Sequence, residues 1–293
     1  MTKGAADTTV LAVDGGGTRC RLALFGPNGR HQVEVGPANV FSGFERAVAE
    51  IRLGVEALAR DANVPADILF DTPAYLGLAG VTDDQVARAV TDALPFSRVR
   101  VSDDRRIALR GALGETDGVL AHCGTGSFLA FQAQGRVRFA GGWGWQLGDQ
   151  ASAYWVVRSA MSVTLDSVDG LIPASDLTRA LLSRFGSSGA IVDFCGTASP
   201  GDIAALAPDI CAAAQKGDPV ARPIFESGAA YLDTVATSLG WRDGMEFCLT
   251  GGIGPHYQDY LPSGLRAALV EPAADPIDGA LDLARMLAME TLP

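Results

Sequence analysis

The chain opens with apolar runs separated by short polar or glycine-rich turns, and the spacing of the apolar positions predicts alternating strands and helices. Continuous or alternating apolar runs indicate strands, whereas apolar positions repeating every three to four residues indicate helices. These patterns predict strands at residues 9–14, 19–26, 30–36, 73–80 and 97–104, and helices at residues 44–62, 82–94 and 105–113. Strands and helices in this order predict an α/β layer with a mixed sheet.

The opening pattern occurs a second time. The stretch VLAHCGTGSFLAFQAQGR (119–136) repeats the layout of VLAVDGGGTRCRLALFGPNGR (10–30). Both contain a strand, a glycine turn with a threonine, a second strand and a Gly-Arg exit. The matching order favours duplication over chance, and it predicts two related α/β halves that each present a glycine hairpin.

The later chain is mostly helical. Its periodicity predicts helices at residues 148–161, 175–185, 200–217, 218–240 and 275–289, with one further strand at residues 245–252. Since no low-complexity linker is present, the two halves are expected to be integrated with each other.

Composition and charge exclude several classes of partner. The 293 residues are 48% hydrophobic, and they carry a net charge of −11 without a basic stripe. We therefore expect no nucleic acid and no membrane as partner, because a phosphate backbone requires clustered Lys and Arg and a membrane span requires about 20 apolar residues. The five scattered cysteines, the lack of a signal peptide and the three separated histidines are typical of a cytoplasmic protein without a metal cluster.

The glycine turns indicate an anion site. Three consecutive glycines (Gly15–Gly17) follow a strand that ends on Asp14, and Thr18 adds a hydroxyl. A tight turn needs positive φ, which glycine supplies, and a row of amides without side chains can bind phosphate. Asp14 could hold Mg²⁺ through water; alternatively, it bonds the turn's own amides. The turns at residues 123–127 and 249–254 favour the nucleotide interpretation, although no Walker A loop or dinucleotide fingerprint is present.

Taken in order, these motifs resemble the N-acetylglucosamine kinase and BadF/BadG/BcrA/BcrD-type ATPase family, within the actin-like sugar-kinase superfold. The matching stretches are DGGGTR (14–19), GPAN (36–39), GLAGV (77–81), VSDDRRIALRGA (101–112), HCGTGS (122–127), GGWGWQLGDQASAYW (141–155), LTGGIG (249–254) and DPIDGALDLA (275–284). The resemblance implies an α/β fold of two ribonuclease-H-like domains, residues 1–114 and 115–274, with a nucleotide cleft between them. Residues 275–293 are expected to pack back on the first domain.

The resemblance also implies roles for individual residues. ATP phosphates would be bound by Gly15, Gly16, Gly17, Thr18, Arg19, Gly124, Thr125 and Gly126, and the adenosine by Gly251 and Gly252. The sugar would be bound by Asn39, Asp104, Thr125, Gly144 and Asp149, with Asp104 as the catalytic base, and Asp14 would hold Mg²⁺ through water. Three positions depart from the family pattern: Arg19 replaces Lys, Asp103 replaces Asn, and Gln150 replaces Glu.

Simpler structural roles remain open for some of these side chains. Asp103 and Asp104 could have no role beyond capping the helix that follows them. Asp149 could be the N-cap of the helix predicted at residues 148–161. Trp143 and Trp145 could contact sugar carbons or pack in the core.

The function expected from the resemblance is an ATP-dependent hexosamine kinase with Mg²⁺, acting on the 6-hydroxyl of N-acetylglucosamine. Glucosamine or a related amino sugar is the alternative acceptor. Two other functions are less favoured alternatives: an ATPase that activates an iron–sulfur dehydratase or reductase, which requires exposed cysteines, and a sugar sensor, which requires a DNA-binding domain. The helices over residues 200–240 could supply a homodimer face.

Overall fold

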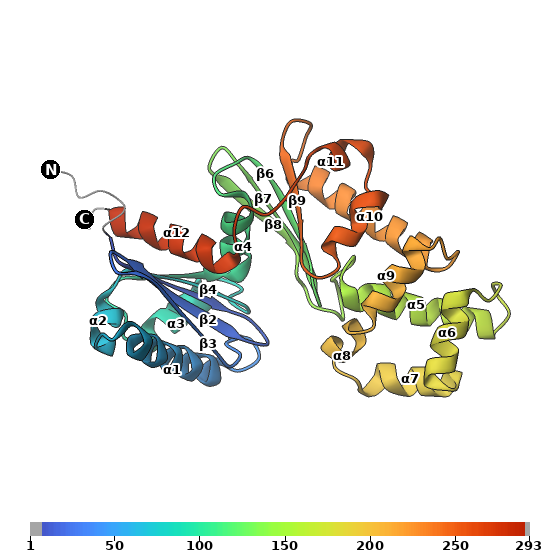
Figure 1. Cartoon of the computed structure of the whole chain (residues 1–293), viewed down its shortest axis with the longest axis horizontal. Helices are drawn as coiled ribbons and strands as arrows, with labels where there is room; N and C mark the ends of the chain where they lie inside the picture. Colours follow the sequence, from blue (N-terminus) through green and yellow to red (C-terminus); the bar gives the residue numbers. More distant parts are fainter. Residues whose placement is uncertain (1–7, 291–293) are drawn as a thin grey trace. The chain divides into compact units, whose positions relative to one another are not determined.

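The computed structural model describes residues 8–290, which form two compact units (Figure 1). The first unit comprises the chain up to Glu115 together with the segment from Pro272 onward, and the second is Thr116–Glu271. Each unit contains one five-stranded mixed sheet with helices packed on it, so the expected α/β fold with two domains is confirmed.

The sheet of the first unit has the strand order β3-β2-β1-β4-β5. Its strands are β1 (Val10–Gly15), β2 (Cys20–Gly26), β3 (Gly29–Val35), β4 (Ala74–Leu78) and β5 (Val99–Asp103). The first three strands are antiparallel, whereas β4 and β5 run parallel to β1. All five agree with the strands predicted from the sequence to within about two residues at each end.

Both faces of this sheet are covered by helices (Figure 1). These are α1 (Phe44–Ala62), α2 (Ala66–Asp71), α3 (Asp84–Ala93), α4 (Asp104–Leu113) and α12 (Pro276–Met289). Successive strand residues point to opposite faces: Leu11 and Val13 lie in the same core as residues of α1, whereas Val10 and Ala12 lie in a second core with residues of α4 and α12. Since β1 is buried on both faces, it reads as a continuous apolar run in the sequence.

The C-terminal helix α12 belongs to the first unit. It lies on α4 so closely that a Cβ on Gly279 would overlap the backbone of Ile107 and Gly111. The amides of Ala273 and Ala274 also donate to carbonyls of α4. One face of the N-terminal sheet is therefore covered by α12, which follows the whole second unit in the sequence.

The second sheet repeats the topology of the first. Its order is β8-β7-β6-β9-β10, with β6 (Gly118–Cys123), β7 (Ser127–Ala133), β8 (Arg136–Gly141), β9 (Glu246–Thr250) and β10 (Leu269–Val270). Again the first three strands are antiparallel and the last two parallel to the central one. The strand-for-strand correspondence supports the duplication inferred from the repeated glycine hairpins.

The second unit carries the additional helices. These are α5 (Ala153–Val168), α6 (Asp176–Phe185), α7 (Ser188–Thr197), α8 (Pro200–Ala204), α9 (Ala207–Gln215), α10 (Ala221–Leu239) and α11 (Ser263–Ala267). The single helix predicted at residues 200–217 is wrong, because the chain breaks between α8 and α9. Pro208 near the start of α9 lacks an amide hydrogen and clashes with the preceding turn, which prevents a continuous helix.

None of the helices within residues 8–290 combines the length and apolarity that crossing a membrane requires.

Candidate active site

The first glycine turn closes the β1–β2 hairpin and leaves two amides available. The Gly16 amide donates to the Arg19 carbonyl at 2.9 Å, and the carbonyls of Gly15 and Gly16 accept from Ala79 and Ala38. Within the described chain, no acceptor is recorded for the amides of Gly17 and Thr18, and both residues are exposed. Two consecutive unbonded amides suit an anion such as a phosphate oxygen.

The second turn, between β6 and β7, has a comparable arrangement. Its Gly124 amide donates to the Gly126 carbonyl at 2.9 Å, and the Gly124 carbonyl accepts from Ala153 at the start of α5. The amides of Thr125 and Gly126 have no recorded acceptor among residues 8–290. Each unit therefore presents one glycine hairpin with two consecutive free amides.

Positive φ does not explain the glycines of these two turns, so that expectation is wrong. Gly15, Gly16, Gly17, Gly124 and Gly126 are all absent from the positive-φ positions of the described chain. Close approach explains several of them instead. A Cβ on Gly15 would meet Leu78, and one on Gly124 would come within 2.9 Å of His122 Nε2.

Asp14 is engaged by an arginine. Its Oδ2 accepts from Arg21 Nη2 at 2.6 Å and from Arg21 Nε at 3.1 Å, because the antiparallel register places Arg21 directly opposite Asp14. The Arg21 guanidinium also lies 4.0 Å from Asp275. The alternative in which Asp14 bonds the amides of its own turn is therefore not what the structure shows.

The donor set around Asp14 fits Mg²⁺ only in the company of phosphate. No group of three His, Cys, Asp or Glu residues within residues 8–290 could hold a metal ion by itself. Mg²⁺ commonly binds through one or two carboxylates, water and substrate phosphates. Asp14 could supply one such carboxylate contact, with the nucleotide supplying the phosphates.

Asp103 and Asp104 lie where β5 passes into α4. Asp103 is the N-cap of α4, and its Oδ1 accepts from the Arg105 amide at 2.8 Å and from Arg105 Nε at 2.7 Å. Asp104 is the first residue of the helix, and its side chain is not needed for the cap. Burial, and then the negative charges of Asp103 and Asp14, raise the pKa of Asp104 to about 7. A carboxylate with this pKa can accept a proton near neutral pH.

Asn39 lies in the loop after β3, near the first turn. Its Oδ1 accepts from the amides of Phe41 and Ser42 at 2.9 and 3.2 Å. A Cβ added to Gly17 would lie 3.9 Å from Asn39 Nδ2. With its oxygen engaged by the loop, Asn39 can offer N–H donors to a ligand.

Asp149 connects the second turn to the tryptophan-containing loop. Its buried carboxylate accepts from the backbone amides of Ser127 and Gly144, and its backbone has φ 59°. Burial raises the pKa of Asp149, and these two hydrogen bonds oppose the rise. The N-cap of α5 is Ser152, so the alternative N-cap role of Asp149 is wrong. The left-handed backbone at Asp149 ends the tryptophan-containing loop before α5 begins.

The two tryptophans of this loop are exposed. Trp143 is 77% exposed and Trp145 is 45% exposed, with the Trp145 ring tilted against Tyr154 at 5.4 Å. Packing in the core is therefore wrong for Trp143. Its exposed aromatic face is available to a ligand.

A pocket of about 600 Å³ lies beside the second turn. Gly124 and Thr125 of the second turn line it, as do Gly251, Gly252 and Ile253 after β9. Helices α8 and α9 supply a further, mostly apolar part of the lining, and His122 and His256 also line the pocket. A largely apolar pocket next to a turn with two free amides has the size and character of a nucleoside site.

The two glycines after β9 have different roles. Gly251 has φ 82°, and a Cβ there would overlap the carbonyl of Cys123, so the fold itself requires glycine. A Cβ on Gly252 would meet no atom within 4 Å. Because Gly252 lines the pocket, a side chain at this position would occupy ligand space.

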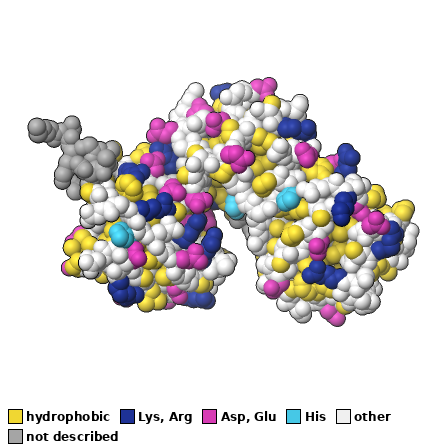
Figure 2. Space-filling model, viewed as in Figure 1, with side chains coloured by type: hydrophobic (Ala, Val, Ile, Leu, Met, Phe, Trp, Pro, Cys, Tyr) yellow, Lys and Arg dark blue, Asp and Glu magenta, His cyan; other side chains and the backbone are white. Residues whose placement is uncertain are grey.

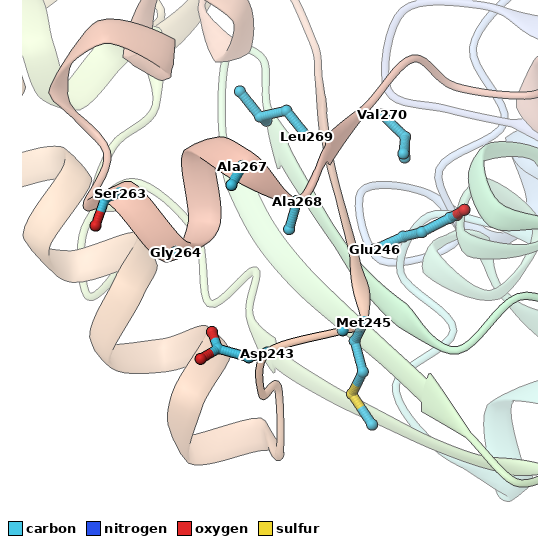
Figure 3. Close-up of a pocket in the computed structure, with 10 residues that line it drawn as sticks. Asp243, Met245, Glu246, Ser263, Gly264, Ala267, Ala268, Leu269 and Val270 are labelled. Atoms are coloured by element: carbon cyan, nitrogen blue, oxygen red, sulfur yellow. The ribbon is translucent and has the colours of Figure 1, made fainter.

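Another pocket of about 570 Å³ lies at the β9–β10 edge of the second sheet (Figure 3). Figure 3 shows the carboxylates of Asp243 and Glu246 pointing in different directions, and none of the predicted site residues lines the pocket. On the face shown in Figure 2, Lys and Arg are interspersed with Asp and Glu. The glycine turns therefore remain the better candidates for chemistry.

The predicted site residues fall into two groups. The first unit holds Asp14, Gly15, Gly16, Gly17, Thr18, Arg19, Asn39 and Asp104, and the second holds Gly124, Thr125, Gly126, Gly144, Asp149, Gly251 and Gly252. Arg19 is exposed and lies 3.6 Å from Glu34. The sequence reasoning missed Arg21, His122 and the α9 wall. The register of β1 against β2 is the signal that could have found Arg21.

Comparison with known proteins decides the family. A profile of the BadF/BadG/BcrA/BcrD ATPase family matches residues 11–281. The chain belongs to this family. It is 28% identical to the glucosamine kinase GspK of Vibrio cholerae over 276 residues, 92% of this chain and 94% of the relative.

Two solved structures of sugar kinases have the same fold as this chain. A crystal structure assigned as a candidate N-acetylglucosamine kinase from Chromobacterium violaceum is 32% identical, with a TM-score of 0.81 over 95% of this chain and 99% of the other. A ROK family glucokinase from Streptomyces griseus, solved with glucose and AMPPNP, matches at 20% identity and a TM-score of 0.55 over 95% of this chain and 99% of that chain. The second likeness shows the fold alone.

Proposed function

We propose that this chain is an ATP-dependent hexosamine kinase that phosphorylates N-acetylglucosamine at the 6-hydroxyl, with glucosamine as the alternative acceptor. The family assignment and the sugar kinases among its relatives support the coarser statement, that it is an ATP-dependent sugar kinase. The proposed proton transfer rests on Asp104, a partly buried carboxylate near Asp14 whose pKa is raised to about 7. The choice of acceptor rests on relatives named as glucosamine kinase and N-acetylglucosamine kinase.

The reaction needs positioning more than covalent chemistry. Asp104 would accept the proton of the attacking sugar hydroxyl while the oxygen of that hydroxyl forms a bond to the γ-phosphorus. The bond between the γ-phosphorus and the bridging oxygen breaks, and ADP leaves with the electron pair. The charge on the transferred phosphoryl group would be stabilised by the free amides of the two glycine turns.

The sugar itself would be held by short polar groups. We assign this role to Asn39 through its amide hydrogens, to the exposed hydroxyl of Thr125, and to the loop around Gly144. The exposed face of Trp143 suits the apolar carbons of a pyranose ring. Mg²⁺, entering with ATP, would neutralise phosphate charge near Asp14.

The iron–sulfur alternative receives no support from the cysteines. Cys20, Cys123, Cys211 and Cys248 are buried, and the thiol of Cys195 lies 3.2 Å from the sulfur of Met161. Cluster ligands shared between subunits would need exposed thiols.

The test is a coupled ADP-release assay with a panel of hexoses and hexosamines, run with and without Mg²⁺. N-acetylglucosamine or glucosamine should give the highest kcat/KM, and removal of Mg²⁺ should abolish turnover. Asp104→Asn keeps the size of the side chain but removes the proton acceptor, so it should lower kcat by at least about 100-fold with ATP binding intact. Near-normal turnover by Asp104→Asn would exclude Asp104 as the base.

A further inference from the structure

One face of α9 lines the pocket beside the second glycine turn along its whole length. Pro208, Cys211, Ala212 and Gln215 have the i, i+3, i+4, i+7 spacing of a single helix face, and all four line the pocket. The face is apolar through Ala212 and becomes polar at Gln215. The second turn, with Gly124 and Thr125, lines the same pocket.

The polar part of the pocket lining includes a hydrogen-bonded pair. Gln215 Nε2 lies 3.3 Å from His256 Nδ1, which joins the end of α9 to the 3₁₀ helix Gly254–Tyr260. Since the Gln amide nitrogen can only donate, His256 Nδ1 accepts in this contact. In this arrangement Gln215 Oε1 takes no part in the contact with His256 and is left as an acceptor for another group.

The pocket thus combines groups that suit the phosphates, the apolar rings and the polar base edge of a purine nucleotide. Phosphates would occupy the free amides of Thr125 and Gly126, the apolar rings would lie along the α9 face opposite Gly252, and the base edge would reach Gln215. An oxygen acceptor at that position complements the exocyclic amine of adenine. The 6-oxo group of hypoxanthine or guanine is an acceptor as well, and it would face Gln215 Oε1 without a hydrogen between them.

We infer that Gln215, oriented by His256, determines the preference of this chain for adenine nucleotides over 6-oxopurine nucleotides. The inference rests on the proposed use of ATP and adds the residues that select the base. Gln215 is the specificity-determining residue, and His256 is a positioning residue that acts through it.

The test compares ATP with ITP, which differ in the base only by the 6-amine or 6-oxo group and the attendant N1 proton. ADP and IDP binding to the full chain is measured by calorimetry without sugar, and kcat/KM for MgATP and MgITP is measured with sugar. The wild type should prefer the adenine nucleotide about tenfold or more, which one hydrogen bond can supply.

Three variants separate the roles of the two residues. Gln215→Leu removes the acceptor, so the preference should fall to about twofold or less through weaker ADP binding. Gln215→Glu keeps an acceptor oxygen and should keep the preference. His256→Phe releases the amide to rotate, so IDP binding should improve while ADP binding weakens.

Gln258→Leu is the matched control. Gln258 lies on the same 3₁₀ helix as His256 and lines a neighbouring pocket instead, so its loss should leave the ADP-to-IDP ratio unchanged. An unchanged ratio in Gln215→Leu, or equal binding of ADP and IDP by the wild type, would overturn the inference. If the base preference is present but no sugar is phosphorylated, the proposed acceptor fails and the assignment of Gln215 stands.

Discussion

The carboxylate of Asp149 lies against Gly126, so that a Cβ added to Gly126 would come within 2.6 Å of Asp149 Oδ2. The same carboxylate accepts from the amides of Ser127 and Gly144. A turn assigned to phosphate and a loop assigned to sugar thus share one buried acceptor. Movement of either segment would break a hydrogen bond to the other.

This contact predicts a stability effect for Asp149→Asn. Asn tolerates the left-handed backbone as well as Asp does, but its amide nitrogen would face a backbone donor. We expect the free energy of unfolding to fall by about 1–3 kcal/mol, the usual cost of an unsatisfied buried group. Urea denaturation measures it, with Asp176→Asn on an exposed helix end as the control. A change below about 0.5 kcal/mol would contradict the shared-acceptor role.

The pKa of Asp104 predicts the pH dependence of the reaction. Only the ionised carboxylate accepts a proton, so kcat/KM for the sugar should fall about tenfold per pH unit below pH 7 and level off above it. Asp103→Asn removes one of the charges that raise this pKa, so the inflection should move to lower pH. Its Oδ1 could still accept from Arg105, which keeps the cap. A pH–rate profile that does not shift in Asp103→Asn would show that the Asp103 charge does not act on the base.

The two glycines after β9 predict opposite outcomes. Gly252→Leu places a side chain in open pocket space without backbone strain, so the Kd for ADP should rise at least about tenfold with an unchanged unfolding transition. Gly251→Ala meets the Cys123 carbonyl and a positive φ, so it should lower Tm. Calorimetry and thermal melts on both variants check this. Full ADP affinity in Gly252→Leu would remove this pocket as the nucleoside site.

We expect that replacing Tyr257, whose buried hydroxyl is unpaired, will stabilise the fold. Its hydroxyl is fully buried against Gly228 and has no hydrogen-bond partner within the described chain. Tyr257→Phe removes the unpaired group and keeps the ring packed on Phe225. The free energy of unfolding should therefore rise by about 1 kcal/mol, and Tm should rise with it. The partly exposed Tyr260→Phe should change stability by less than about 0.5 kcal/mol. A lower Tm for Tyr257→Phe would mean that the hydroxyl stabilises the fold.

Much of the fold could be predicted from local patterns, because the strands of the first sheet are apolar runs bounded by glycine turns. The repeated hairpin even revealed the duplication that the two strand orders display. The break between α8 and α9 was missed because periodicity outweighed Pro208. Strand β10 was missed because two residues give no pattern.

The candidate site residues likewise fall into those that local motifs predict and those that only the folded structure brings together. The turns and Asp104 stand in contiguous motifs and could be found by reading along the chain. Arg21 meets Asp14 only through strand register, and the α9 wall meets the second turn only through tertiary packing. The glycine conformations were misjudged because crowding by Leu78, His122 and Asp149 is invisible in a sequence.

The position of α12 has a consequence for how the chain acquires its structure. During synthesis, one of the two cores of the first sheet lacks its cover until the final segment has emerged, whereas Thr116–Glu271 is complete earlier. In a ribosome-bound nascent chain, Thr116–Glu271 should therefore become resistant to protease before the strands of the first sheet do. Loss of α12 would then expose Val10 and Ala12 of β1, which lie far from the truncation in sequence.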